Sequence, residues 1–179
     1  RLHPSELSLA HRMDCLRTLK RLGFQTGAGF MVGSPGQTAH TLAEDMVFLQ
    51  ELEPEMVGIG PFLPHHDTPF AKEPAGDGAQ TLYLLSLVRL MLPTVLLPAT
   101  TALGTLLPNG REQGMEAGAN VVMPNLSPGD VRDKYLLYDN KLHSGDEAAE
   151  SVRHLRETMA AIGYQVVADR GDHWKMTEK

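Results

Sequence analysis

Residues 98–105, Pro-Ala-Thr-Thr-Ala-Leu-Gly-Thr, combine hydroxyl groups with small side chains in a pattern typical of a binding site. The preceding run Val95-Leu96-Leu97 predicts a buried strand, so the hydroxyls fall where that strand should end. Ligands of α/β proteins bind at the carboxyl ends of the strands. We therefore predict that Thr100 and Thr101 line a pocket for a small anionic ligand. The alternative is structural, because threonine is also a good strand former.

Three further side chains are predicted to border the same cavity. Met123 ends the next predicted strand, just before Pro124-Asn125, and should open onto the same space. Tyr135 and Tyr138, three residues apart, can place two phenols over its mouth. The structural alternatives are a methionine packed in the core and an aromatic pair packed on the rim.

The other reactive side chains favour less specific interpretations. Arg12, in a predicted helix, can clamp a carboxylate, although an exposed helical arginine is the ordinary alternative. Cys15 is the only cysteine, which excludes an internal disulfide, and its apolar neighbours predict a packed thiol. His65, His66 and Asp67 are metal-ligand types, but adjacent side chains rarely converge, and the nearby prolines predict a loop. We therefore assign no metal site in this chain.

Composition narrows the class of protein. A chain of 179 residues has the usual size of one domain and can bury a core. Its net charge of −6 and the lack of a lysine- or arginine-rich run argue against nucleic-acid binding. The most apolar run, residues 81–92, is too short to span a bilayer, so we expect no membrane partner. The single cysteine fits a cytoplasmic setting. With no signal peptide and no initiator methionine, we expect a piece of a longer protein.

Helices and strands are predicted to alternate along the chain. Apolar periodicity indicates helices at residues 6–22, 39–52, 79–92, shortly after 109–110, and 146–162. Their predicted N-terminal signals are Ser5, Thr38 and the capping box Ser144/Glu147. Strands are predicted at residues 25–33, 56–62, 95–101 and 120–124, with a small edge strand at 164–168 and a loose tail after Asp169.

Four successive β/α units predict a parallel sheet with right-handed crossovers. They make either half of a (β/α)8 barrel or a complete doubly wound sheet. Glycines at the first two strand ends and threonines at the third favour the barrel, in which every strand end faces one cavity.

Four blocks of the sequence resemble a known family. They are TGAGFMVGSPGQT at 26–38, MVGIGPFLPH at 56–65, PATTALG at 98–104 and NVVMPN at 120–125. In this order they resemble the C-terminal half of HydE, the radical S-adenosylmethionine (SAM) maturases of FeFe-hydrogenase. Biotin synthase and methylornithine synthase share the barrel and match these blocks less well.

The resemblance implies that residues 1–140 form strands five to eight of a (β/α)8 barrel and that residues 141–179 form a C-terminal helix and tail. The family cleaves SAM to a 5′-deoxyadenosyl radical at a 4Fe–4S cluster, whose cysteine ligands are expected in the N-terminal half. With Cys15 alone, this chain is expected to be inactive by itself. The implied partners are a small sulfur-containing iron substrate, other hydrogenase maturases and an electron donor.

The resemblance also implies roles for individual residues. Those expected to bind SAM are Arg12, Gly29, Gly33, Pro61 and Leu63, with Arg12 at the carboxylate and the strand end at 60–63 at the adenine. Those expected to line the substrate cavity are Thr100, Thr101, Met123, Tyr135 and Tyr138. Some members carry an accessory cluster at the positions of His143, Ser151 and His154; without sulfur ligands we expect that cluster to be missing here.

Two alternative functions stay open. One is a biotin synthase-like or methylornithine synthase-like reaction on the same scaffold. The other is a non-catalytic half-barrel that binds a ligand, although such a half-barrel would expose two sheet edges.

Overall fold

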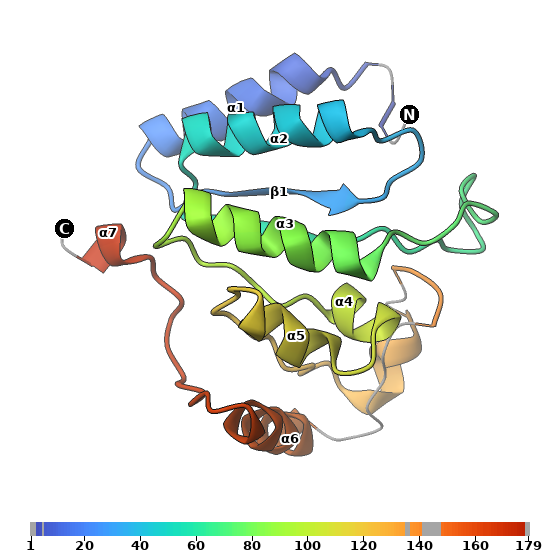
Figure 1. The fold of residues 1–179 in the computed structure, drawn as a ribbon, viewed down its shortest axis with the longest axis vertical. Helices are drawn as coiled ribbons and strands as arrows, with labels where there is room; N and C mark the ends of the chain where they lie inside the picture. Colours follow the sequence, from blue (N-terminus) through green and yellow to red (C-terminus); the bar gives the residue numbers. More distant parts are fainter. Residues whose placement is uncertain (1–2, 5, 135–136, 141–147, 178–179) are drawn as a thin grey trace.

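The computed structural model describes residues 3–4, 6–134, 137–140 and 148–177 (Figure 1). Its sheet has two parallel strands, β1 (Gly27–Val32) and β2 (Met56–Pro61), paired over their whole length from Gly27↔Met56 to Val32↔Pro61. Beyond β2, two isolated parallel bridges, Met56↔Leu96 and Pro98↔Val121, bring the segments around residues 96–98 and 121 alongside the sheet. The prediction of an α/β protein with a parallel sheet is confirmed. The predicted strands at 95–101 and 120–124 are wrong in extent, because each is reduced to isolated bridges.

Helices connect and surround these strands. They are α1 (Leu9–Arg21), α2 (Ala39–Leu52), α3 (Gly78–Met91), α4 (Thr101–Leu106), α5 (Gly110–Glu116), the 3-10 helix η1 (Gly129–Lys134), α6 (Ala148–Ala161) and α7 (Trp174–Thr177). The predicted helices at 39–52 and 79–92 are confirmed to within one residue, as is the Thr38 cap. The capping box Ser144/Glu147 lies outside the described residues.

One helix, α4, was not predicted and explains why the third strand is short. The Thr100 hydroxyl accepts a hydrogen bond from the Leu103 backbone N–H, which makes Thr100 the N-cap of α4. A hydroxyl that satisfies a free N–H in this way favours helix initiation over strand continuation. The chain therefore turns into a helix at Thr101, where the sequence pattern predicts a strand.

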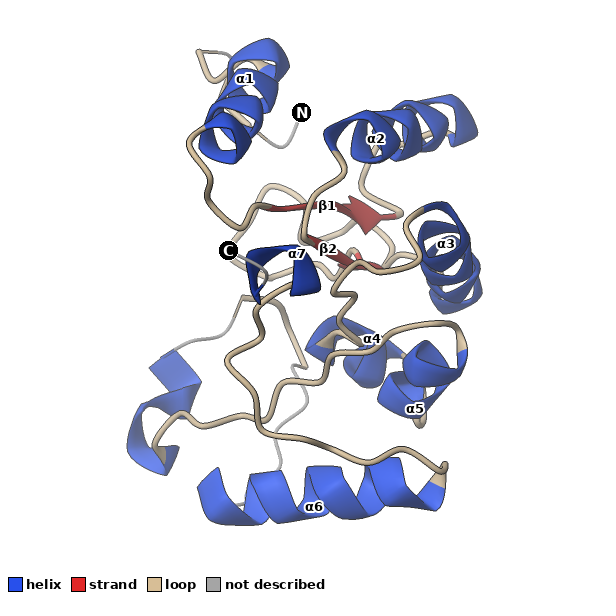
Figure 2. Cartoon of the chain, turned by 90° about the vertical axis from the view of Figure 1, so that its left-hand side faces the viewer, coloured by secondary structure: helices blue, strands red, loops and turns tan. Residues whose placement is uncertain are grey.

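The sheet is covered on one face and open on the other. Alternation along the strands sends Val32, Val57 and Ile59 to the same buried face. There they pack with apolar side chains of α2 and α3, such as Leu49 and Leu85, in one core cluster. Figure 2 shows α2 and α3 on one side of the two strands. The predicted apolar run at 81–92 is thus a core helix. No helix in the described part of the chain is long and apolar enough to cross a membrane.

The first helix is poorly buried. None of its residues is buried, and Leu9 and Leu22 are each about two-thirds exposed. The prediction that Cys15 is a packed thiol is wrong: its side chain is exposed, because the apolar stripe of α1 has little of the described chain to pack against. The N-cap is Ser8, which accepts from the His11 N–H; the predicted cap Ser5 lies outside the described residues.

The C-terminal tail is bound at the amino-terminal side of the sheet. The Gln25 side chain donates to the Gly171 carbonyl over 3.1 Å and accepts from the His173 N–H over 2.6 Å. His173 is 3% exposed, and α7 follows it close to the strands (Figure 2). The prediction of a loose tail is therefore wrong. So is the predicted edge strand at 164–168, which has no regular structure.

Candidate functional site

Several glycines lie on the open face of the sheet. Gly29 and Gly58 lie opposite each other on β1 and β2. A Cβ added at Gly29 would lie 1.8 Å from the Gly58 carbonyl oxygen, so glycine is required for the strands to pair here. A Cβ added at Gly58 would meet no atom within 4 Å. The result is a flat backbone surface with free space above Gly58, where an extended or planar ligand can lie.

Three of the predicted residues lie at the carboxyl-terminal edge of this sheet. Gly33 follows β1, Leu63 follows β2, and Thr100 follows the bridge at Pro98. Thr100 also contacts the open face, because a Cβ at Gly60 would lie 2.6 Å from its Oγ1 atom. Of the predicted substrate residues, Thr100 therefore lies beside Gly60, next to the predicted SAM residue Pro61.

The structure explains why Gly33 and Pro61 stand at the edge of the sheet. Gly33 has a φ of +80°, and a Cβ there would lie 2.5 Å from the Gly76 Cα. Its N–H donates to the Gln37 side chain over 2.6 Å. Pro61 is buried at the end of β2. Both residues shape the edge of the sheet with their backbone, whatever ligand lies beside them.

The structure gives less information on the predicted site residues Arg12, Tyr135 and Tyr138. Arg12 is exposed on α1, whose first turn lies at the end of the molecule to which β1 points (Figure 1). Tyr135 lies outside the described residues. Tyr138 is half-buried, and its burial raises the pKa of the phenol, although a hydrogen bond to Thr105 and the charge of Arg111 act in the opposite direction.

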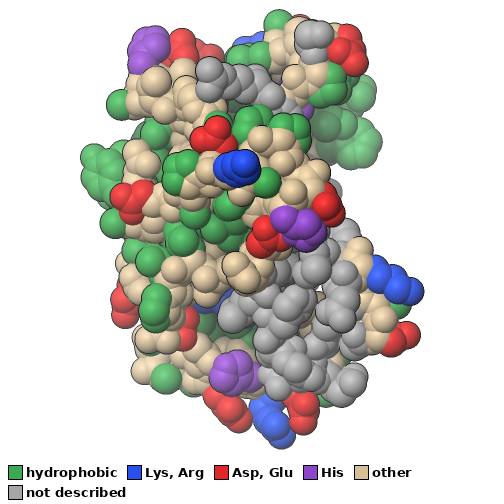
Figure 3. Space-filling model, turned by 90° about the vertical axis from the view of Figure 1, so that its right-hand side faces the viewer, with side chains coloured by type: hydrophobic (Ala, Val, Ile, Leu, Met, Phe, Trp, Pro, Cys, Tyr) green, Lys and Arg blue, Asp and Glu red, His purple; other side chains and the backbone are tan. Residues whose placement is uncertain are grey.

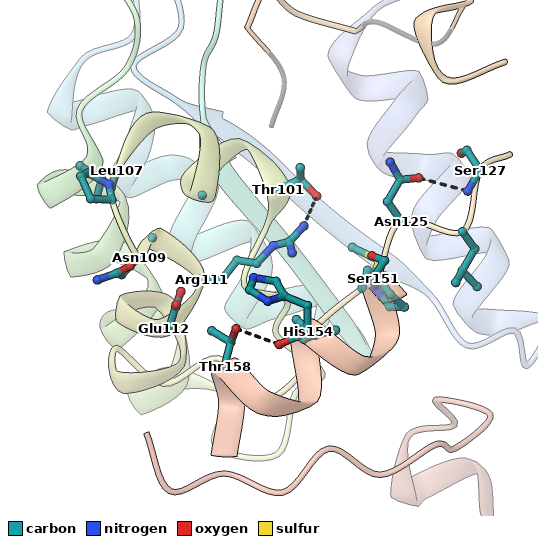
Figure 4. Close-up of a pocket in the computed structure, with 17 residues that line it drawn as sticks. Thr101, Leu107, Asn109, Arg111, Glu112, Asn125, Ser127, Ser151, His154 and Thr158 are labelled. Carbon is teal, nitrogen blue, oxygen red and sulfur yellow. Dashed lines mark hydrogen bonds between the residues drawn. The ribbon is translucent and has the colours of Figure 1, made fainter. Parts of the chain in front are cut away.

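Thr101 and Met123 line a separate cavity of about 810 Å³ between α4, α5, residues 123–127 and α6 (Figure 4). Thr100 is not among the residues that line it. The two adjacent threonines thus face different spaces, since Thr100 contacts the strand face and Thr101 the cavity. On α6, Ser151 and His154 also line this cavity, whereas His143 lies outside the described residues.

Arg111, at the start of α5, is the cavity residue that sequence reasoning missed. Its NH2 group donates to Thr101 Oγ1 over 3.4 Å (Figure 4). Its Nε atom is buried and has no hydrogen-bond acceptor among the described residues. Burial lowers the pKa of the guanidinium, which nevertheless stays protonated at neutral pH. The available signal was the turn at Asn109-Gly110, where a Cβ at Gly110 would lie 2.2 Å from the Leu103 carbonyl and α5 packs closely on α4.

The histidine loop after β2 also differs from expectation. The loop is confirmed, but the prediction that its side chains point apart is wrong. A turn closed by the Thr68 N–H and the His65 carbonyl brings ligand atoms of His65, His66 and Asp67 within 4.8 Å of one another. His66 Nδ1 lies 2.7 Å from Asp139 Oδ1, which raises the pKa of His66 and lowers that of Asp139. Figure 3 shows the face to which β1 points, where histidine and acidic side chains gather.

Comparison with known proteins supports the resemblance drawn from the sequence. No family model matches the chain. It is 51% identical over 173 residues to the [FeFe] hydrogenase maturase subunit HydE of Thermotoga maritima, covering 97% of this chain and 50% of that protein. It is 28% and 26% identical to the 3-methylornithine synthases of Methanosarcina barkeri and Methanosarcina acetivorans, over 83% and 81% of this chain. The chain spans about half the length of the curated relatives that it matches. The resemblance to HydE is confirmed.

Proposed function

We propose that this chain is part of a radical SAM enzyme of the HydE type that acts in FeFe-hydrogenase maturation. Residues 1–140 form strands five to eight of its (β/α)8 barrel, and residues 141–179 form the closing helix and tail. The observation that carries the proposal is the 51% identity to HydE over nearly the whole chain. The parallel order of β1, β2 and the two bridges, with helices on one face, is consistent with one side of a barrel.

The open glycine face is the proposed SAM surface. The space above Gly58 fits a ligand that lies flat on the strands, and Gly29 keeps the backbone level there. Pro61 and Leu63 end β2 beside the adenine, Gly33 shapes the edge, and Arg12 holds the carboxylate of the ligand through its guanidinium. When bound, SAM supplies the source of the 5′-deoxyadenosyl radical.

The 4Fe–4S cluster does not fit the described residues. Such a cluster needs several thiolates, and Cys15 is a single exposed cysteine on α1. The cluster ligands of the proposed enzyme would therefore come from sequence outside this chain. In this scheme the chain holds SAM and the substrate and does not carry out reductive cleavage by itself.

The substrate side of the proposed enzyme is formed by Thr100, Thr101, Met123, Tyr135 and Tyr138. Its substrate is a small sulfur-containing iron species, and its partners are other hydrogenase maturases and an electron donor in the cytoplasm. Thr100 has a second role as the cap of α4. Thr101→Val, which removes a hydroxyl from the cavity, is therefore the test, and Thr100→Ser, which keeps both the hydroxyl and the cap, is its control.

The proposal is tested by SAM binding and by 5′-deoxyadenosine formation in the protein at its natural length, with its cluster reconstituted. In Gly58→Val, a branched side chain fills the open face, and we expect SAM affinity to fall about 10-fold or more. Gly27→Val is the matched control at the amino end of β1, where a Cβ makes only ordinary contacts. Absence of SAM cleavage by the wild type, or equal SAM binding by both variants, would contradict the proposal.

The matches to 3-methylornithine synthase favour a second candidate on the same scaffold. A product assay separates the two. Formation of 3-methylornithine would favour this candidate, whereas support of hydrogenase maturation without that product would favour the first.

A further inference from the structure

Arg111 is a partly buried charge that forms no ion pair with a carboxylate of the described residues, although the charge of Glu112 acts on it. Its Nε atom is shielded from solvent, and within the described part of the chain its side chain donates a hydrogen bond to the neutral hydroxyl of Thr101. A buried guanidinium that lacks an anionic partner is unfavourable, and in folded proteins such charges are normally paired.

Arg89 and Arg111 are both partly buried arginines, and each has one buried nitrogen without an acceptor among the described residues, NH2 in Arg89 and Nε in Arg111. Arg89 nevertheless donates to the carbonyls of Gly118, Leu92 and Pro93 and thereby ties α3 to neighbouring backbone. Among the described residues, Arg111 makes no hydrogen bond to a carbonyl. Its guanidinium instead borders the 810 Å³ cavity, which is large enough for a small organic molecule (Figure 4).

We propose that Arg111 binds a carboxylate group of a small ligand in this cavity. The guanidinium lines the cavity, and its NH2 group is already oriented by Thr101. The side chains of Asn125, Ser151 and His154 line the other walls and supply polar groups for the rest of the ligand. The inference deepens the proposed function, on which it rests for the assumption that this ligand is the substrate.

The charges that line the cavity largely offset each other. Glu112 lines the same cavity and brings a negative charge close to Arg111. A dianion such as phosphate is attracted more strongly by Arg111 than a monoanion is, but it is also repelled more strongly by Glu112. The second charge of a phosphate therefore gains little attraction here, and the cavity offers phosphate no advantage over a carboxylate.

The experiment measures binding of acetate by NMR titration of the natural-length protein at constant ionic strength, without SAM or a reconstituted cluster. We expect saturable acetate binding that is weakened about 10-fold or more in Arg111→Met. Arg156→Met, an exposed arginine on α6 outside the cavity, removes the same charge and should bind acetate as the wild type does. Inorganic phosphate, the second probe, should bind no more tightly than acetate.

Several results would overturn the inference. These are unchanged acetate binding in a folded Arg111→Met, equal weakening in Arg156→Met, or tighter binding of phosphate than of acetate. If Arg111→Met does not fold, Arg111→Lys keeps the charge and loses the forked donor, and its acetate affinity must then fall. Because no SAM chemistry enters this measurement, its failure would leave the proposed radical reaction untouched, and failure of SAM cleavage would leave acetate binding untouched.

Discussion

Residues 27–91 and residues 95–161 form their candidate binding surfaces in opposite ways. In the first region, β1 and β2 pair over six residues, and their core side chains pack with α2 and α3. Glycines leave backbone uncovered on the open face, which also carries Met31 and Met56. In the second region, strand pairing is reduced to single bridges, and helices α4, α5 and α6 enclose a cavity lined by side chains. A continuous sheet offers a flat surface, whereas a shortened one leaves room for a cavity and a buried charge.

The largest expected effect is a loss of stability in the first region. Gly29→Ala places a methyl group 1.8 Å from the Gly58 carbonyl, and neither strand can move away without loss of pairing. We expect the free energy of unfolding to fall by about 3 kcal/mol or more. Gly58→Ala, its register partner, meets open space and should change stability by less than about 1 kcal/mol. Equal losses in urea unfolding would show that Gly29 is no more closely opposed by the neighbouring strand than Gly58 is.

Core truncations compare how tightly the two regions are packed. Leu85→Ala removes a fully buried side chain from the core beneath the sheet, and we expect a loss of about 3 kcal/mol. Leu155→Ala, on α6, borders the cavity, where the surroundings can relax, so a loss of about 2 kcal/mol is expected. Chemical denaturation of both variants measures the difference. A larger loss for Leu155→Ala would reverse the comparison.

A buried carboxylate at the amino end of the sheet gives the first region a pH dependence. Glu55 Oε2 accepts from the Thr26 N–H over 2.8 Å, and Oε1 lies 3.0 Å from Lys20 Nζ. Burial alone would raise the pKa of Glu55, but the bonds from Thr26 and Lys20 lower it below the ordinary 4.5. Its contribution to stability is therefore present above that value and is lost as pH falls through the lower folded pKa.

We expect Glu55→Gln to cost about 1.5 kcal/mol at neutral pH, since a charge-assisted hydrogen bond is replaced by a neutral one. The cost should vanish at a pH below the folded pKa of Glu55. Thermal melts across this range provide the measurement, and Glu51→Gln, exposed on α2, is the control. A cost that does not change with pH would mean that the charge of Glu55 contributes nothing.

The smallest expected effect concerns the exposed pair that joins the two regions. Asp139 raises the pKa of His66 through its hydrogen bond, so the stabilisation is complete below the ordinary histidine pKa and is lost as pH rises through the folded value. In Asp139→Asn, the NMR-measured pKa of His66 should move down toward its ordinary value. The exposed pair His40–Glu44 on α2 is far from the substitution in sequence, and its NMR resonances serve as the reference that should be the same in both proteins. An unmoved His66 would show that the pair does not form in solution.

The sequence predicted the first region better than the second. The helices at 39–52 and 79–92 carry apolar stripes and side-chain caps, so local patterns were sufficient. The strand ending at Thr100 was predicted too long, because a threonine that favours strands also caps helices. Arg111 was missed, because the turn at Asn109-Gly110 marks only where a helix begins and does not distinguish a partly buried arginine from an exposed one. The convergence of His66 and Asp139, 73 residues apart, is likewise purely tertiary.

The bond between Gln25 and the tail has a consequence for the order of folding. Gln25 and Gly171 are separated by 146 residues, so their contact closes most of the chain into one loop. Closing so long a loop costs the chain conformational entropy before the two hydrogen bonds can form. This contact should therefore form after the local helices and strand pairs. Interactions that form late mainly affect the rate of unfolding. The tail should therefore slow unfolding. Loss of its hydrogen bonds to Gln25 would shorten the lifetime of the folded state and leave the rate of folding almost unchanged.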